Sequence, residues 1–279
     1  MKRITQKTEP AFIDQQKQMD ELEPMNLIKS GVMELFGTFF LVYFGGLSVM
    51  AMGGGAAGYS SPTLPGVAFT HCCILCIMIC IGGPISGAQY NPAVSLGLMA
   101  ILKLHWMKGL INIVAQIIAS FLAALLLKIF LPDDLEDGGL GYPKMPDPPM
   151  TAIKILIYET FGTFILVLVI TCGVLTNKPA QVIGVYVGVT LLVCINGFGF
   201  FTGTSLNPAR TLGPSLLSGG TDDGITRSGF WGYYLGNIVG GVLGAVVGRY
   251  LFYPEDVPAP NMRENAKYGK TNTEDHPLN

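Results

Sequence analysis

The sequence predicts an all-α membrane protein with six transmembrane helices, two re-entrant half-helices and an inverted internal repeat. Three observations lead to this prediction. Half of the 279 residues are hydrophobic and only 13% are charged, whereas about 25% are charged in ordinary soluble domains. No Asp, Glu, Lys or Arg occurs between Glu34 and Lys103. Two sequence motifs also occur twice, in the same order, which indicates that the chain consists of two related halves.

Six apolar windows are long enough to cross a hydrocarbon core, which takes about 20 helical residues. They lie near 27–50, 67–83, 106–131, 151–175, 181–200 and 229–252. Two further apolar pieces, 92–101 and 208–217, are too short to cross, because each covers only about 15 Å. We interpret them as half-helices that enter the membrane from one side. Such irregular backbone is tolerated at membrane depth only where protein buries it or where it lines a wet cavity.

The repeated motifs relate the two halves of the chain. Residues 34–42 (ELFGTFFLV) recur as 159–167 (ETFGTFILV), and residues 87–97 (GAQYNPAVSLG) recur as 203–213 (GTSLNPARTLG). Each half contains three spans, so the second half is expected to lie upside down relative to the first. The two half-helices then enter from opposite faces, and their N-termini meet near the midplane of the bilayer.

Charged residues orient the chain and bound its domain. Placing both termini in the cytoplasm puts most of the lysines and arginines inside and the acidic segments 133–137 and 222–223 outside, as the positive-inside rule requires. We expect no removable signal peptide, since no short apolar core with a small-residue cleavage site precedes the first span. The prediction is one membrane domain over 27–253, with halves at about 27–131 and 151–253, between cytoplasmic tails 1–26 and 254–279.

Several function classes are excluded by composition and motifs. A formal net charge of −2 offers no basic surface for a nucleic acid. The sequence has no Walker loop, no histidine cluster with metal-ligand spacing and no nucleophile with a paired base, so we expect no enzyme activity, metal or cofactor. The six cysteines lie in or near apolar stretches, and we interpret them as small buried hydrophobic residues.

Two Asn-Pro-Ala motifs carry the functional prediction. They are Asn91-Pro92-Ala93 and Asn207-Pro208-Ala209, and each is typical of a helix start, since Asn is a favourable N-cap and Pro suits the first helical position. The positive helix ends would repel cations and turn a water oxygen toward the asparagine amides. A file of water that is inverted at its centre cannot relay a proton. We therefore predict a pore that passes neutral molecules and excludes ions and protons.

With these motifs the chain resembles the aquaporin (major intrinsic protein) family, over about residues 27 to 253. The resemblance includes both Asn-Pro-Ala motifs, the repeated Glu34 and Glu159, and Arg210 directly after the second motif. It implies a passive water channel that forms a homotetramer with one pore per subunit. The expected location is among the lipids of the plasma membrane or the vacuolar membrane.

The resemblance also implies a selectivity filter, which ungapped counting from the motifs places at His71, Ile195, Thr204 and Arg210. Arg210 is the only charged residue of a long apolar stretch and is expected to donate to passing water and repel cations. The alternatives are a structural salt bridge for Arg210 and a hydrogen bond between helices for His71. This set resembles the wider filters of plant vacuolar aquaporins, so ammonia, urea and hydrogen peroxide are candidate solutes beside water.

Two further features are interpreted as structural. Glu34 and Glu159 are ionisable groups inside spans, one in each half, and are expected to accept hydrogen bonds from the re-entrant loops; the alternative is a proton relay. Every fourth residue of the last span is glycine, which lets another helix approach closely. These glycines are Gly232, Gly236, Gly240, Gly244 and Gly248.

Three alternatives to a water channel remain at this stage. Glycerol-conducting relatives typically carry Asp after the second motif and a Pro-Leu pair in the last helix, where this chain has Thr211 and Phe230-Trp231. A proton-coupled transporter would need titratable groups at the midplane, where this chain has two asparagines. A closed junctional scaffold would conduct nothing.

Overall fold

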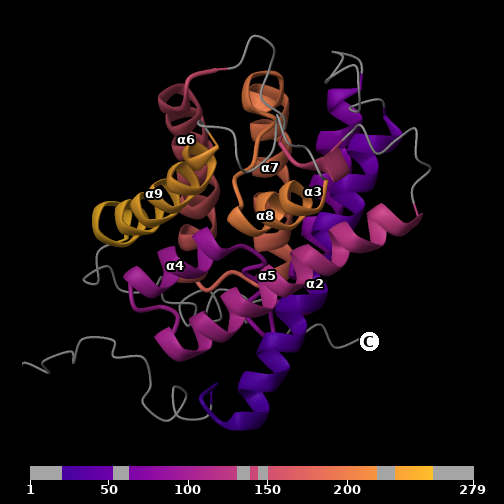
Figure 1. The fold of residues 1–279 in the computed structure, drawn as a ribbon. Coiled ribbons are helices and arrows are strands. Elements are labelled where there is room, and N and C mark those ends of the chain that lie inside the picture. The colour runs from indigo at the N-terminus through magenta and orange to yellow at the C-terminus, as the bar shows by residue number, and fades with distance from the viewer. Residues whose placement is uncertain (1–20, 53–62, 131–138, 144–149, 219–229, 254–279) are drawn as a thin grey trace, which may run out of the picture.

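The computed structural model describes residues 21–52, 63–130, 139–143, 150–218 and 230–253. In these residues the architecture is all-helical. The helices are α2 (Pro24–Ala51), α3 (Leu64–Gly82), α4 (Pro92–Ala100), α5 (Trp106–Phe130), α6 (Ala152–Leu175), α7 (Ala180–Thr202), α8 (Pro208–Leu217), α9 (Trp231–Val247) and the π-helix η2 (Gly248–Phe252) (Figure 1). The expected tail 254–279, most of the tail 1–26 and the acidic segments 133–137 and 222–223 lie outside the described residues.

The predicted spans and half-helices are confirmed. Six helices of the described chain are long and apolar enough to cross a membrane, while α4 and α8 have only 9 and 10 residues. The fifth span, α7, continues two residues beyond the expected end. It stops at Gly203, whose left-handed backbone (φ 74°) is a conformation that favours glycine and ends a helix.

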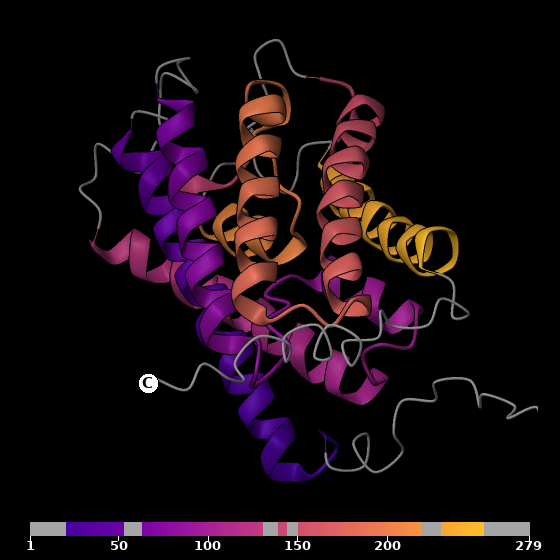
Figure 2. The same ribbon diagram turned by 180° about the vertical axis from the view of Figure 1, so that it is seen from behind.

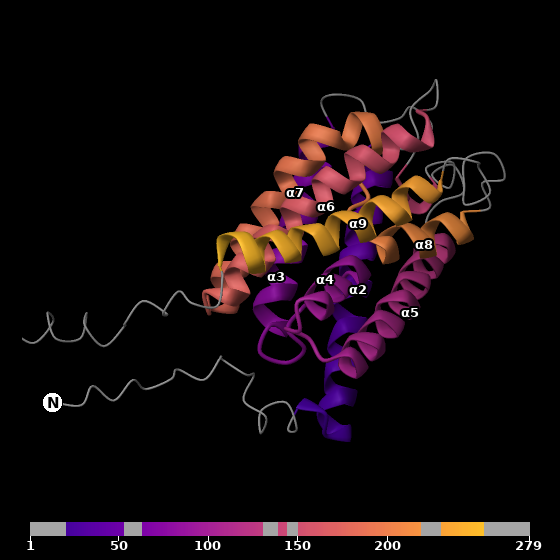
Figure 3. The same cartoon turned by 90° about the vertical axis from the view of Figure 1, so that its left-hand side faces the viewer.

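The helix contacts follow the internal repeat. The first and third spans of each half pack together, as α2 with α5 and as α6 with α9. Each half-helix lies instead against the third span of the other half, α4 against α9 and α8 against α5 (Figure 3). From behind, α3, α7, α6 and α9 form a continuous row of neighbours (Figure 2). The two halves are therefore interlocked through their half-helices.

The glycine stripe of the last span lies against α6. A Cβ atom on Gly232 would lie 2.6 Å from the carbonyl oxygen of Ala152, and one on Gly236 would lie 2.8 Å from that of Leu156. The other glycines of the stripe also contact α6: Gly240 at Thr160, Gly244 at Phe164 and Gly248 at Thr171. Side chains here would push the two helices apart, so the close packing of α6 and α9 depends on the repeated glycines.

A glycine at the equivalent repeat position of each half-helix allows close packing on the third span of the other half. A Cβ atom on Gly97 of α4 would lie 2.8 Å from the carbonyl oxygen of Gly241 in α9. Gly213 of α8 lies even closer to Ser120 of α5, and the Ser120 hydroxyl donates to the carbonyl oxygen of Ala209. The half-helices are thus held at fixed depth by backbone contacts.

The cysteines differ from the expectation of full burial. Cys194 is buried, but Cys72, Cys73, Cys76, Cys80 and Cys172 are partly exposed, and all six are free thiols. The surfaces of the spans also expose many large apolar side chains, among them Phe69, Phe161 and Phe200. A thiol is apolar enough for such a lipid-facing surface, so it does not require the protein interior.

Candidate pore site

Both Asn-Pro-Ala asparagines are N-caps of their half-helices. Oδ1 of Asn91 accepts a hydrogen bond from the backbone N–H of Ala93 at 2.9 Å. Oδ1 of Asn207 accepts from the N–H groups of Ala209 at 2.9 Å and Arg210 at 3.3 Å. The proline that follows each asparagine occupies the first helical turn, where its missing N–H costs nothing. The positive ends of both half-helices therefore lie at the asparagines.

The two asparagines also bind each other's loops. Nδ2 of Asn91 donates to the carbonyl oxygen of Leu206 at 2.7 Å, and Nδ2 of Asn207 donates to that of Tyr90 at 2.8 Å. One of the two N–H groups of each amide is therefore used in the reciprocal bond. The second N–H of each amide is left for a molecule in the cavity.

The loops that lead into the half-helices share an unusual backbone. Ala88 and Tyr90 have positive φ values of 51° and 50°, and the equivalent residues of the second half, Thr204 and Leu206, have 50° and 52°. Left-handed backbone in residues other than glycine costs about 1–3 kcal/mol each and persists only where the surroundings impose it. Both loops must therefore be held by other groups.

In the first half, the holding group is Glu34, which is fully buried. Its Oε1 accepts from the N–H of Gln89 at 2.9 Å and from the hydroxyl of Ser86 at 2.7 Å. Its Oε2 accepts from the N–H of Tyr90 at 2.6 Å and from Nε2 of Gln116 at 2.8 Å. Four donors around one carboxylate account for its stability at membrane depth.

Glu159 has the same arrangement in the second half and is 1% exposed. It accepts from the N–H groups of Ser205 at 3.0 Å and Leu206 at 2.9 Å, and from the Thr202 hydroxyl at 2.7 Å. The partners are loop groups at equivalent repeat positions. This is the geometry expected of a carboxylate that supports a loop.

A narrow cavity of about 30 Å³ brings the predicted site residues together. Its lining includes His71, Asn91, Ile195, Thr204, Asn207 and Arg210, and its other wall consists largely of leucine side chains. Within the described residues, Nη1 of Arg210 and Oγ1 of Thr204 are buried but have no hydrogen-bond partner. The part of the chain that the structure describes has no carboxylate within ion-pair distance of Arg210. The cavity thus contains polar groups that a small polar molecule would satisfy.

His71, which also lines this cavity, is held by a hydrogen bond within its own helix. Its Nδ1 lies 2.9 Å from the carbonyl oxygen of Val67, one turn earlier in the same helix. A carbonyl only accepts, so Nδ1 carries the proton and Nε2 of the neutral ring is an acceptor. Nε2 lies beside Gly45, where a Cβ atom would be only 2.5 Å away. Gly45 therefore makes the space for the imidazole, and the hydrogen-bond partner of His71 lies within α3.

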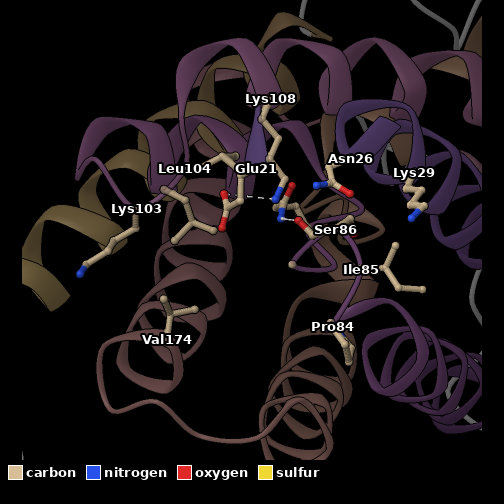
Figure 4. A pocket seen from close by; sticks show the side chains of 14 residues that line it. Glu21, Asn26, Lys29, Pro84, Ile85, Ser86, Lys103, Leu104, Lys108 and Val174 are labelled. Carbon is tan, nitrogen blue, oxygen red and sulfur yellow. Dashed lines mark hydrogen bonds and ion pairs between the residues drawn. The ribbon is translucent and has the colours of Figure 1, made fainter. Parts of the chain in front are cut away.

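A second, wider pocket of about 770 Å³ lies against the segment 83–89 that leads into α4 (Figure 4). No pattern in the sequence indicates this pocket. Lys108 of α5 is largely buried there and forms an ion pair with Glu21, with an Nζ to Oε2 distance of 3.4 Å. Lys29 and Lys103 also line this pocket. No local sequence signal identifies the pair, because its two partners are distant in the chain.

Two inverted half-helices, capped by asparagines that face each other beside a narrow and sparsely polar cavity, define a class of membrane channel. A sequence model of the family described as "Major intrinsic protein" matches residues 21–248. The chain belongs to this family.

Similar proteins agree with this assignment. Nodulin-26 of Glycine max is 30% identical over 254 residues, which cover 90% of this chain and 88% of the relative. Aquaporin AqpM of Methanothermobacter thermautotrophicus is 32% identical over 250 residues, which cover 81% and 98%. The X-ray structure of the aquaglyceroporin from Plasmodium falciparum superposes with a TM-score of 0.70 at 25% identity, covering 82% of this chain and 98% of that one. This chain is a multi-pass membrane protein and a passive channel, and its relatives are channels rather than enzymes.

Proposed function

We propose that this channel conducts water through the cavity between Asn91, Asn207 and Arg210 and excludes protons and ions. The supporting observation is that Nη1 of Arg210 and Oγ1 of Thr204 are buried without partners in the cavity that both asparagines line. Leaving a buried donor unsatisfied costs about 1–3 kcal/mol. Water in the cavity removes that cost while making only a few hydrogen bonds, so it binds weakly enough to move on.

The exclusion of protons follows from the orientation of the water. The remaining N–H of each asparagine amide donates to the oxygen of a water at the midplane, and the two positive helix ends favour the same orientation. Hydrogens of neighbouring waters then point away from the centre on both sides. A proton relay through this file would have to reverse every water, and a bare cation would meet positive potential with few acceptors.

We propose that His71, Ile195, Thr204 and Arg210 form the selectivity filter. The guanidinium of Arg210 donates and repels cations, while Nε2 of His71 accepts. Ile195 contributes an apolar wall. A passing molecule must therefore be small, neutral and able to both donate and accept, which ammonia, urea and hydrogen peroxide satisfy beside water.

Glycerol is the second candidate solute, because one structurally similar protein is an aquaglyceroporin. Two observations favour water. A cavity of about 30 Å³ suits water-sized molecules, whereas a three-carbon polyol would need side chains to move. The position after Arg210 holds Thr211, whose hydroxyl is engaged with the Ser205 hydroxyl at 2.5 Å.

We further propose a homotetramer in the plasma membrane or the vacuolar membrane, with both termini in the cytoplasm. The apolar side chains exposed along the spans provide surfaces for lipid and for neighbouring subunits. The distribution of lysines and arginines supports the orientation. We propose Glu34 and Glu159 as structural supports of the two loops rather than as proton relays.

Stopped-flow measurements on proteoliposomes test the proposed function. Vesicles with the purified protein are expected to shrink in an osmotic gradient much faster than empty vesicles, without proton or ion current. Parallel gradients of glycerol, urea and ammonia define the solute range. A current coupled to solute uptake would instead indicate a transporter, and permeability equal to that of empty vesicles would indicate a closed scaffold.

A further inference from the structure

Two buried amides outside the pore lie at equivalent positions of the two halves. Asn112 of α5 and Asn237 of α9 are separated in sequence by the same distance as Glu34 and Glu159, and both are fully buried within spans. A side-chain amide inside an apolar span is costly unless its groups are hydrogen-bonded. Each is therefore expected to have a specific partner, and each has two.

In the first half, Asn112 links the first span to the loop. Its Oδ1 accepts from the hydroxyl of Ser30 in α2 at 2.9 Å. Its Nδ2 donates to Oε1 of Gln89 at 2.6 Å. Gln89 lies between Ala88 and Tyr90, the two left-handed residues of this loop.

In the second half, Asn237 makes the same link with different residues. Its Oδ1 accepts from the hydroxyl of Thr163 in α6 at 3.0 Å, and its Nδ2 donates to Oγ of Ser205 at 2.7 Å. Ser205 is the repeat equivalent of Gln89, and it too lies between two left-handed residues, Thr204 and Leu206. The arrangement is thus repeated, although the loop side chain that the amide binds is glutamine in one half and serine in the other.

Gln89 and Ser205, the loop residues that these amides bind, each precede a residue that contacts the opposite asparagine. Tyr90 follows Gln89, and its carbonyl oxygen accepts from Asn207. Leu206 follows Ser205, and its carbonyl oxygen accepts from Asn91. A continuous path of bonds therefore runs from the third span of each half, through that half's own loop, to the pore asparagine of the other half.

We propose that Asn112 and Asn237 are positioning residues for the pore: each holds one loop so that its carbonyl oxygen orients the asparagine of the opposite half. The glutamates already satisfy the backbone N–H groups of the loops, whereas the two amides hold the side chains between the strained residues. This inference rests on the proposed function, since it concerns the same cavity.

The test compares Asn112→Leu and Asn237→Leu with the matched controls Ser30→Ala and Thr163→Val. Leucine has nearly the shape of asparagine but cannot form the hydrogen bond to the loop. Each control removes only the hydrogen bond that the same amide accepts from the first span of its half. If a leucine variant does not fold, the smaller substitutions Asn112→Ala and Asn237→Ala replace it, since they also remove the bond between the amide and the loop. All variants are purified as the full chain and reconstituted in lipid vesicles.

Two measurements are made on each variant. The first is the ratio of urea permeability to water permeability, which is independent of the amount of folded protein. We expect it to change about fivefold in the leucine variants, as the loss of the hydrogen bond to the loop predicts, and to stay near the wild-type value in the controls, which keep that bond. The second is hydrogen–deuterium exchange over residues 84–91 and 203–210. We expect Asn237→Leu to accelerate exchange in both segments, since the loop it holds orients Asn91.

The outcomes separate this inference from the proposed function. If the wild-type protein does not conduct water, the proposed function is wrong, and exchange in the opposite loop still tests the positioning role. If the wild-type protein conducts but the leucine variants match their controls in both measurements, the positioning role is wrong. Equal changes in the leucine variants and the controls would also overturn the positioning role, because they would show that both bonds of each amide only stabilise the fold.

Discussion

At the scale of single residues, the cavity owes its properties to a few polar groups in an apolar wall. Asn91 and Asn207 each donate one amide N–H to the opposite loop, and the second N–H of each amide is left for a molecule in the cavity. Nη1 of Arg210 has no partner in the described chain. The two asparagine amides are held by hydrogen bonds to both half-helices and both loops, so they do not have to rearrange when a molecule arrives.

Replacing Arg210 by valine tests its proposed role in the filter. The change removes the charge and the donor at the cavity, so permeability to urea and to small cations is expected to rise about tenfold or more, equivalent to about 1.4 kcal/mol. The measurement is stopped-flow and current recording on proteoliposomes. Arg210→Lys retains the charge and should still exclude cations. An unchanged permeability profile in Arg210→Val would contradict the role.

The two asparagine N-caps are expected to contribute differently to the stability of the protein. Asn207 caps two backbone N–H groups, one of which belongs to Arg210, whereas Asn91 caps one. Loss of a cap costs about 1 kcal/mol, so Asn207→Ala should lower the thermal midpoint more than Asn91→Ala and should also alter solute selectivity. Thermal unfolding of the purified protein in detergent checks the order. Equal midpoints, or the reverse order, would argue against it.

At the scale of helices, small residues determine how closely elements approach. The glycines of α9 lie on the backbone of α6, and one glycine on each half-helix lies against the third span of the other half. Without hydrophobic driving force inside a bilayer, such van der Waals contact is a principal source of helix association. The depth of the half-helices, and hence the meeting of the asparagines, depends on these contacts.

Gly236→Ala and Gly197→Ala form a matched pair that tests this packing. A Cβ atom on Gly236 would lie 2.8 Å from the carbonyl oxygen of Leu156, whereas one on Gly197 of α7 meets nothing within 4 Å. Alanine is otherwise favoured over glycine in a helix by about 0.5–1 kcal/mol. Gly236→Ala should therefore lower the thermal midpoint and Gly197→Ala should leave it unchanged or raise it. Similar effects at both positions would refute the packing argument.

At the scale of the whole molecule, the inverted repeat is what makes a single pore from two half-helices. Neither half contains a complete site, because Asn91 is held by Leu206 and Asn207 by Tyr90. The half-helices also pack on the opposite halves. Folding of one half alone would leave these groups unpaired, so the two halves are expected to fold and function as one unit.

The proposed orientation is a further prediction at this scale. Epitope tags placed separately at the N-terminus and the C-terminus should be reached by antibody only after the cell membrane is permeabilised, or from the cytosolic side of an intracellular membrane. The described residues contain six spans, an even number, so both tags are expected to behave alike. Access to either tag in intact cells would overturn the cytoplasmic assignment, and opposite behaviour of the two tags would overturn the six-span topology.

Features that depend on neighbouring residues could be predicted from the sequence alone. Apolar length predicted the six spans, and Asn followed by Pro predicted the starts of α4 and α8. The duplicated motifs predicted that the halves are inverted and that Glu34 and Glu159 play equivalent parts. These signals are local or periodic, so composition and spacing are sufficient to show them.

The contacts that join the two halves could not be predicted from the sequence and are seen in the folded chain. The reciprocal asparagine bonds connect residues 115 and 117 positions apart, and nothing in the local sequence distinguishes Leu206 or Tyr90 as partners. The sequence does not distinguish Asn112 and Asn237 for the same reason: the role of a polar residue in a span depends on its partner. The physical reason is that hydrogen bonding in an apolar interior is set by which groups packing brings together, and packing is a property of the folded chain.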